Sequence, residues 1–104
     1  MKTIQFRNYE LAVSLDEYQN GRLAVSLHDA QTQEPFGTVT VNLPDANIVA
    51  ENTSYLDVNN CSDLIDLFIE LELVEIVSGV RSASGFCTYP LGAFDLDKLE
   101  EYID

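Results

Sequence analysis

The first 43 residues alternate apolar and polar side chains in three separate segments. Their apolar positions are Leu11, Val13 and Leu15, then Leu23, Val25 and Leu27, then Val39, Val41 and Leu43. Successive side chains of a β-strand point to opposite faces, so each segment predicts a strand with one apolar face. Three such strands in sequence, joined by polar connections, predict an antiparallel β-meander.

The turn between the first two of these strands can be predicted from burial. A two-residue loop would pair Leu15 with Ser26 and would put apolar and polar side chains on the same face. A three-residue loop over residues 19–21 instead pairs Leu15 with Val25, so that both point to the core. Gly21 supplies the left-handed residue that this longer loop needs, and we therefore predict the three-residue loop.

Ahead of the meander, Ile4 and Phe6 predict one more short strand. Its apolar positions are even-numbered, whereas those of the following strand are odd-numbered. A tight turn near Asn8 that pairs Phe6 with Leu11 would reconcile the two, and so would a β-bulge. We favour the turn.

Residues 44–60 are the least regular part of the chain, with an apolar pair at Ile48-Val49 and a further strand predicted near Tyr55. A helix is predicted over about Cys61 to Leu73, with Asn60 as its N-cap. Its predicted buried stripe consists of Leu64, Leu67, Phe68 and Leu71.

Beyond the helix, residues 75–85 predict a connection or a weak strand, with turns at Gly79 and Gly85. Residues 86–91 predict a strand, which Pro90 would end or confine to a sheet edge. Asp95 or Asp97 is then expected to cap a short helix that ends near Ile103. Three aromatic residues are expected to seal this helix against the sheet: Tyr89, Phe94 and Tyr102.

Strands followed by helices indicate the α+β class. We expect an antiparallel β-meander of about four to six strands, with one main helix and a short C-terminal helix packed on one face. The 104 residues are the length of one ordinary domain, so we expect a single domain over residues 1–104.

The charge of the chain predicts which kinds of partner the protein can bind. Eighteen acidic residues face five basic ones, which gives a formal net charge of −13, and no Lys or Arg occurs between Leu23 and Val80. Such a surface repels phosphate backbones and anionic lipids, so direct nucleic-acid and membrane binding are not expected. It would steer a basic protein partner toward itself. The alternative is that the charge serves solubility only.

Three carboxylates have a sharper interpretation. Asp63, Asp66 and Glu70 fall within about 60° of one another on the predicted helix, at rises of about 4.5 and 6 Å. Because B-DNA carries one charge per about 1.7 Å of its axis, such a row could imitate phosphates for a DNA-binding cleft. These residues are the candidate partner-binding site, and the alternative is an ordinary solvated helix face.

The sequence predicts no catalytic, cofactor-binding or metal-binding residues. His28 is the only histidine, lies on the polar side of a strand and is expected to be exposed. Residues 57–63 begin like a calcium loop but lack its glycine and its final glutamate. Cys61 and Cys87 are expected to be free thiols of a reducing compartment. Because residues 1–7 contain no apolar signal segment, we expect a cytoplasmic protein.

Four segments also carry a resemblance to a known family: VTVNLPD at 39–45, DVNN at 57–60, SGFCTYPL at 84–91 and FDL at 94–96. From residue 20 to the C-terminal helix, the chain resembles a family of short acidic proteins of unknown function. Its members are found on plasmids, conjugative elements and phages of low-GC Gram-positive and gut bacteria. The resemblance transfers no site residues. It implies a context in which small acidic anti-restriction and anti-CRISPR proteins are common.

Together these observations predict a non-enzymatic acidic protein of a mobile element. We expect it to bind a basic, DNA-binding protein and to act as a DNA-mimic inhibitor. One alternative is a regulatory module that binds through an apolar patch or through a sheet edge near Tyr89. Another is a small enzyme, which would need a pocket of convergent polar groups.

Overall fold

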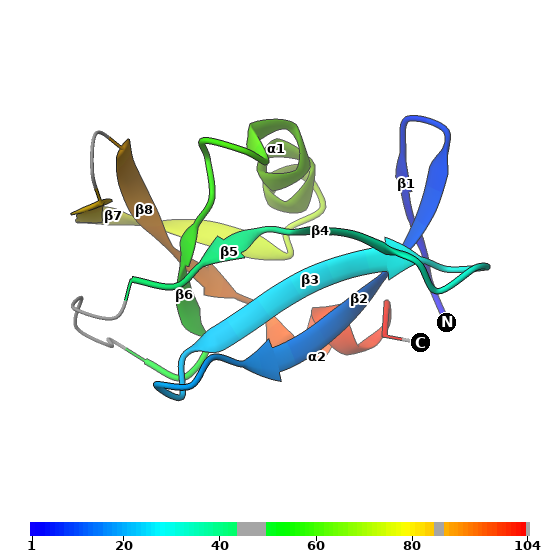
Figure 1. Ribbon diagram of the computed structural model, residues 1–104, viewed down its shortest axis with the longest axis horizontal. Coiled ribbons are helices and arrows are strands. Elements are labelled where there is room, and N and C mark those ends of the chain that lie inside the picture. The colour runs from blue at the N-terminus through cyan, green and yellow to red at the C-terminus, as the bar shows by residue number, and fades with distance from the viewer. Residues whose placement is uncertain (44–49, 85–86, 104) are drawn as a thin grey trace.

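The computed structural model describes residues 1–43, 50–84 and 87–103, and in it two four-stranded antiparallel sheets pack together with two helices. The first sheet has the strand order β1-β2-β3-β4 and the second has the order β5-β6-β8-β7. In Figure 1, β3 and β4 cross in front of the second sheet, α1 lies at the top and α2 lies below. The α+β class is therefore confirmed, but the described residues form eight strands instead of about four to six, and these strands make two sheets instead of one meander.

The first sheet contains four strands: β1 (Ile4–Phe6), β2 (Tyr9–Glu17), β3 (Leu23–Asp29) and β4 (Pro35–Thr38). The second contains β5 (Thr40–Val41), β6 (Thr53–Leu56), β7 (Val74–Ser84) and β8 (Cys87–Phe94). The helices are α1 (Ser62–Glu70) and α2 (Leu96–Glu100). The predicted strand near Tyr55 is thus confirmed, whereas the Ile48-Val49 pair, Gly85 and Phe86 lie outside the described residues.

The β2–β3 hairpin has the predicted register. Leu15 pairs with Val25, and the N–H of Tyr18 donates to the carbonyl of Arg22, which leaves a loop of three residues. Gly21 has a φ of 82°, the left-handed conformation that the loop requires. Burial of the apolar face therefore selected the turn, as expected.

The β1–β2 turn lies at the predicted place, but the predicted pairing is wrong. Phe6 pairs with Tyr9, and Ile4 pairs with Leu11. This register places Ile4 and Leu11 together in the core, at 1% and 0% exposure. Arg7, at a φ of 56°, is one of the two turn residues. A two-residue turn with a residue of positive φ suits the twist of a hairpin.

The third predicted strand is divided between the two sheets. The N–H of Val39 donates to Val25 of β3, while its carbonyl accepts from Asp57, which follows β6. Val39 therefore connects β4 in the first sheet with β5 in the second. Because Val39 is fully buried, the alternation of apolar and polar residues continues where the chain passes from the first sheet to the second. The sequence pattern therefore does not reveal this passage.

Helix α1 is shorter than predicted, and Asn60 is not its N-cap. The N-cap is Cys61, which makes no side-chain capping bond. Asn60 instead donates its backbone N–H to the carboxylate of Asp57. At the other end, Glu72 has a φ of 61°, and the N–H of Leu73 donates to the carbonyl of Phe68. This left-handed C-terminal motif ends the helix before Leu71.

Of the two alternatives for residues 75–85, a connection or a weak strand, the strand is confirmed: residues 75–84 belong to the eleven-residue strand β7. Gly79, at a φ of 78°, lies where the pairing with β8 shifts register, so the predicted turn is a bulge within the strand. The prediction for Pro90 is wrong as well, because β8 continues to Phe94 and lies between β6 and β7. Pro90 is tolerated one residue beyond the last β6 partner, Leu91.

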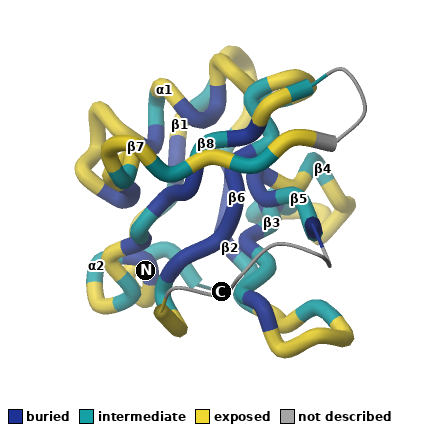
Figure 2. Tube along the Cα trace, turned by 90° about the vertical axis from the view of Figure 1, so that its left-hand side faces the viewer, coloured by how far each residue is buried: buried dark blue, intermediate teal, exposed yellow. Residues whose placement is uncertain are grey.

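The main core lies between the two sheets and α1, and buried residues line the strands at the centre of the molecule (Figure 2). From α1 it takes Leu64 and Phe68 as predicted, and also Ile65, whereas Leu71 is 38% exposed because the helix ends beside it. Tyr89 was expected to seal α2. It belongs instead to a second cluster on β8, together with Leu43, Tyr55 and Leu91.

The two ends of the chain are joined through α2. Asp95 caps this helix, as one of the two predicted alternatives, by accepting the N–H of Lys98 at 3.1 Å. Beyond α2, the carbonyl of Tyr102 accepts the N–H of Val13, and that of Glu101 accepts the N–H of Lys2. Residues 2 and 101, near the two ends of the chain, therefore lie side by side.

Candidate functional site

Helix α1 presents the three predicted carboxylates to solvent. Asp63, Asp66 and Glu70 are all exposed. Arg7 approaches Asp63, with Nη2 3.1 Å from Oδ2, whereas Asp66 and Glu70 make no ion pair with any residue that the structure describes. The predicted face therefore exists, but part of the charge on Asp63 is offset by a cation from the β1–β2 turn.

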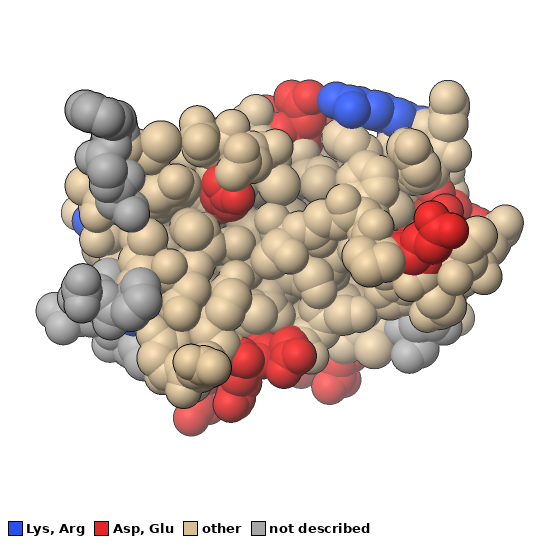
Figure 3. Space-filling view, viewed as in Figure 1, with Lys and Arg blue, Asp and Glu red and all other residues tan. Residues whose placement is uncertain are grey.

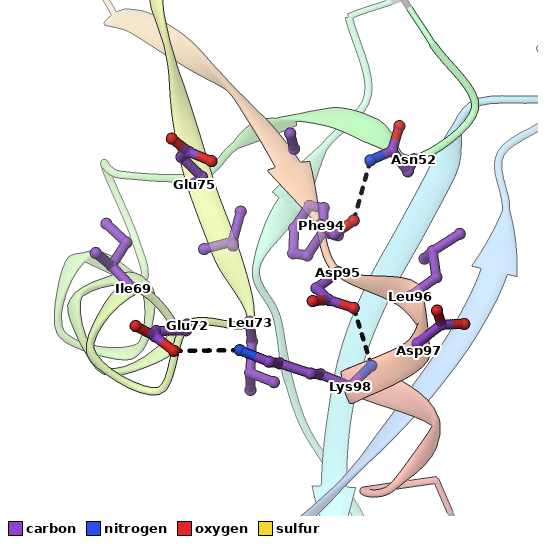
Figure 4. Close-up of a pocket in the computed structure, with 12 residues that line it drawn as sticks. Asn52, Ile69, Glu72, Leu73, Glu75, Phe94, Asp95, Leu96, Asp97 and Lys98 are labelled. Carbon is purple, nitrogen blue, oxygen red and sulfur yellow. Dashed lines mark hydrogen bonds and ion pairs between the residues drawn. The ribbon is translucent and has the colours of Figure 1, made fainter.

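A larger acidic feature lies at the opposite end of α1. A groove of about 740 Å³ runs between the end of α1, the start of β7 and the start of α2 (Figure 4). Its carboxylates belong to Glu72, Glu75, Asp95 and Asp97, which lie in the turn after α1, in β7, at the N-cap of α2 and in α2. Besides Asn52 and Lys98, its other lining residues are apolar: Ile69, Leu73, Val74, Ala93, Phe94 and Leu96. We call this feature the acidic groove.

One cation lies within the acidic groove. Lys98 extends from α2, and its ammonium is 3.2 Å from a carboxylate oxygen of Glu72 (Figure 4). The carboxylate of Asp95 is used in capping α2. Glu75 and Asp97 are exposed and make no ion pair within the described residues. The groove thus holds more negative than positive charge.

Apolar side chains are exposed close to these carboxylates in the sequence. Ile69 is 37% exposed, Leu71 is 38% exposed and Ile76 is 46% exposed. They alternate with Glu70, Glu72 and Glu75 over the end of α1 and the start of β7. A contiguous apolar patch with a polar rim marks a protein-binding surface, whereas apolar residues exposed singly are common on any protein.

Charge is unevenly distributed over the remaining surface. On the face seen in Figure 3, which carries β3, β4 and β5, uncharged residues cover most of the centre and most carboxylates lie toward the margins. Lys2 pairs with Glu101 at 3.4 Å, Arg22 is 3% exposed, and Arg81 is exposed. The basic residues therefore offset few of the exposed carboxylates.

The surroundings of His28 differ from the prediction. The imidazole is half-buried, with Nδ1 3.0 Å from Oγ of Ser14, and a hollow of about 500 Å³ lies beside it. A Ser–His pair acts as a nucleophile when a third group orients the base. The neighbouring carboxylate of Asp29 accepts the backbone N–H groups of Gln31 and Thr32. It is therefore committed to the β3–β4 turn.

The cysteines are free thiols, as predicted. The Sγ of Cys61 lies 3.3 Å from the carbonyl oxygen of Thr38. Burial raises the pKa of the Cys61 thiol, and the nearby Asp57 carboxylate adds to this effect. Within the described residues, no group of three or more His, Cys, Asp or Glu side chains is arranged to hold a metal ion.

The α1 face was predicted from the sequence, whereas the acidic groove was not. Asp95 was recognised as a cap, but its proximity to Glu72 and Glu75 was not. Those glutamates are visible in the sequence as part of the stretch without basic residues. Nothing in the sequence indicates that residues 69–75 and 93–98 lie on either side of one groove.

Comparisons with known proteins identify a family without an assigned activity. The sequence matches a family model described as Domain of unknown function (DUF4313) over residues 12–104. No curated protein and no solved structure matches the chain. Among the described helices, none has the length and apolar composition needed to cross a membrane.

Proposed function

We propose that this protein, which belongs to the DUF4313 family of domains of unknown function, is non-enzymatic and acidic and binds a basic, DNA-binding protein. One observation carries the proposal: the exposed carboxylates extend from α1 into the acidic groove, and most of them have no cationic partner among the described residues. Glu70 and Glu75 are examples on either side of the turn after α1.

Electrostatics support a basic target. A group of negative charges on one part of a surface raises the rate at which a positively charged protein associates. Salt screens this effect. The same charge repels nucleic acids and anionic membranes. The centre of the face over β3 to β5 is largely uncharged (Figure 3), so association would be guided toward the exposed carboxylates elsewhere on the surface, among them those of α1 and the acidic groove.

The narrower form of the proposal is DNA mimicry. Asp63, Asp66 and Glu70 would occupy phosphate-binding positions in the partner, and the protein would compete with DNA stoichiometrically. The resemblance described above supports a mobile genetic element as its source and an anti-restriction or anti-CRISPR role. Such an inhibitor would act in the cytoplasm, where its target meets foreign DNA.

Binding and inhibition of a purified restriction endonuclease and of a Cas9-type nuclease test the proposal. The test variant carries Asp63→Asn, Asp66→Asn and Glu70→Gln together. The matched control carries Asp16→Asn, Glu17→Gln and Glu34→Gln, which remove the same charge from exposed positions on β2 and in the β3–β4 connection. Affinity should fall steeply between about 0.05 and 0.5 M salt, and the α1 variant should lose more than the control.

DNA must also displace the protein from its target. If neither nuclease binds the wild-type protein at low salt, or if bound protein and DNA do not compete, the mimicry proposal is wrong.

A second candidate function has support from the exposed apolar residues. A regulatory module would bind its partner through Ile69, Leu71 and Ile76. Apolar contacts persist in salt, so this binding would survive about 0.5 M salt and the α1 charge variant, and would be lost with Ile69→Ser and Ile76→Ser.

A further inference from the structure

We propose that the acidic groove takes a lysine or arginine side chain of the partner, which replaces Lys98 at the carboxylate of Glu72. This inference rests on the proposed function and adds to it the chemistry of the contact. The groove lies between α1, β7 and α2, and its volume of about 740 Å³ is ample for one long side chain.

The walls of the groove suit the stem of such a side chain. Ile69 lies on one side of the groove and Leu96 on the other (Figure 4), and both offer accessible apolar surface. Leu73 and Phe94, between the two helices, are only 1% and 2% exposed. Lysine and arginine carry three or four methylene groups that pack on apolar surface while their charged heads stay in a polar setting. A groove with both kinds of lining fits a long basic side chain better than it fits a small ion.

The polar groups of the groove suit the head of the side chain. Glu72, Glu75 and Asp97 are exposed, and they come from three different parts of the fold. Lys98 is the only basic residue lining the groove, within the described part of the chain. An incoming cation therefore meets an excess of carboxylates.

Within the protein itself, Lys98 already makes the ammonium–carboxylate contact that we propose for the partner. Its stem crosses the groove from α2, and its ammonium reaches Glu72 at 3.2 Å (Figure 4). The side chains of this pair are 41% and 80% exposed, so the ion pair is solvated and weak. A partner cation can exchange with Lys98 at little energetic cost, which leaves Lys98 free to turn toward solvent.

A hexalysine peptide serves as the probe, with binding followed by calorimetry and by amide shifts in NMR. The groove variant is Glu72→Gln with Glu75→Gln, and the charge-matched control is Asp16→Asn with Glu34→Gln. We expect the groove variant to bind about fivefold more weakly and the control less than twofold more weakly. The amide shifts should centre on Ile69, Leu73 and Leu96.

Removing Lys98, which competes with the partner cation for Glu72, should raise the affinity for hexalysine instead of lowering it. Lys98→Gln should bind hexalysine about threefold more tightly, whereas Lys2→Gln, which removes the same charge outside the groove, should change affinity much less. Ile69→Ser should weaken binding with no change in charge. Far-UV circular dichroism verifies that each variant is folded.

Equal effects of the groove and control variants, or amide shifts spread over the whole surface, would overturn the groove contact. The proposed function would then still stand on its nuclease test. If the nuclease test fails but the hexalysine response is specific to the groove, the groove contact stands and the proposed function is wrong.

Discussion

Arg7 and Asp63 are 56 positions apart in the chain, and their side chains form an ion pair of 3.1 Å between the β1–β2 turn and the first turn of α1. Arg7 also lies over the ring of Phe6, at 4.8 Å from its centroid. One of the few cations of this protein is thus held against the predicted partner-binding face, where it reduces the negative charge.

We expect Arg7→Gln to strengthen binding to a basic partner while leaving the fold almost as stable. The two side chains of the pair are 67% and 69% exposed, so its loss should lower the free energy of unfolding by less than about 1 kcal/mol. Urea unfolding and titration with the nuclease partner at low salt measure the two effects. Lys2→Gln is the control for net charge, and equal tightening by both variants would show that position on α1 is irrelevant.

Removing the hydroxyls of the neighbouring residues Ser54 and Thr53 should change the free energy of unfolding in opposite directions. The hydroxyl of Ser54 is fully buried and has no hydrogen-bond partner among the described residues. The Thr53 hydroxyl donates to the carbonyl of Ala50 at 2.6 Å and accepts its N–H at 3.1 Å. Ser54→Ala should raise the free energy of unfolding by up to about 1 kcal/mol, and Thr53→Val should lower it by about 1 kcal/mol. Urea unfolding compares them, and destabilisation by Ser54→Ala would contradict the assignment.

Gly92 is required for close packing of β8 on the core. A Cβ at this position would lie 2.8 Å from Cδ2 of Leu56, which is fully buried. Gly92→Ala should therefore lower the free energy of unfolding by about 1–3 kcal/mol. A Cβ at Gly37 meets nothing within 4 Å, so Gly37→Ala is the matched control. Adding Leu56→Val to Gly92→Ala should recover part of the loss, and thermal unfolding follows all three variants.

Asp29 makes the β3–β4 turn sensitive to acid. The backbone N–H groups of Thr32 and Gln31 hydrogen-bond its carboxylate and lower the pKa of that group from its usual 3.8. A lowered pKa in the folded state contributes stability that is fully present above pH 3.8 and is lost as the pH falls through the lower, folded value.

Unfolding by urea between pH 7 and pH 2.5 measures this contribution, together with an NMR titration of the Asp29 carboxyl. The Asp29→Asn variant should lose less stability than the wild type on acidification below about pH 4. A carboxyl that titrates at or above its usual value would contradict the proposed turn bonding.

Much of the first half of the fold follows from residues close together in sequence. The β2–β3 register was predicted because its apolar face, its loop length and Gly21 agree. The β1–β2 pairing was not, because a short strand ending in an aromatic residue satisfies alternation in two registers, and only burial of Ile4 beside Leu11 decides between them.

The second half depends on contacts that the pattern does not contain. The length of α1 is set by Glu72 adopting a left-handed conformation, which its residue type does not favour. The central position of Pro90 depends on where the pairing with β6 ends. The division of the third strand at Val39 depends on having two sheets to bridge.

The sequence by itself determined the α+β class, the register of its main hairpin, the cap of α2 and the excess of acidic residues. These depend on periodicity, on local backbone chemistry and on composition, which are all properties of near neighbours. Only the tertiary structure decided which charges meet: Arg7 reaches α1, Lys98 reaches Glu72, and two distant segments enclose the acidic groove. Coulomb interactions and packing depend on separation in space, and the chain sets that separation only when it folds.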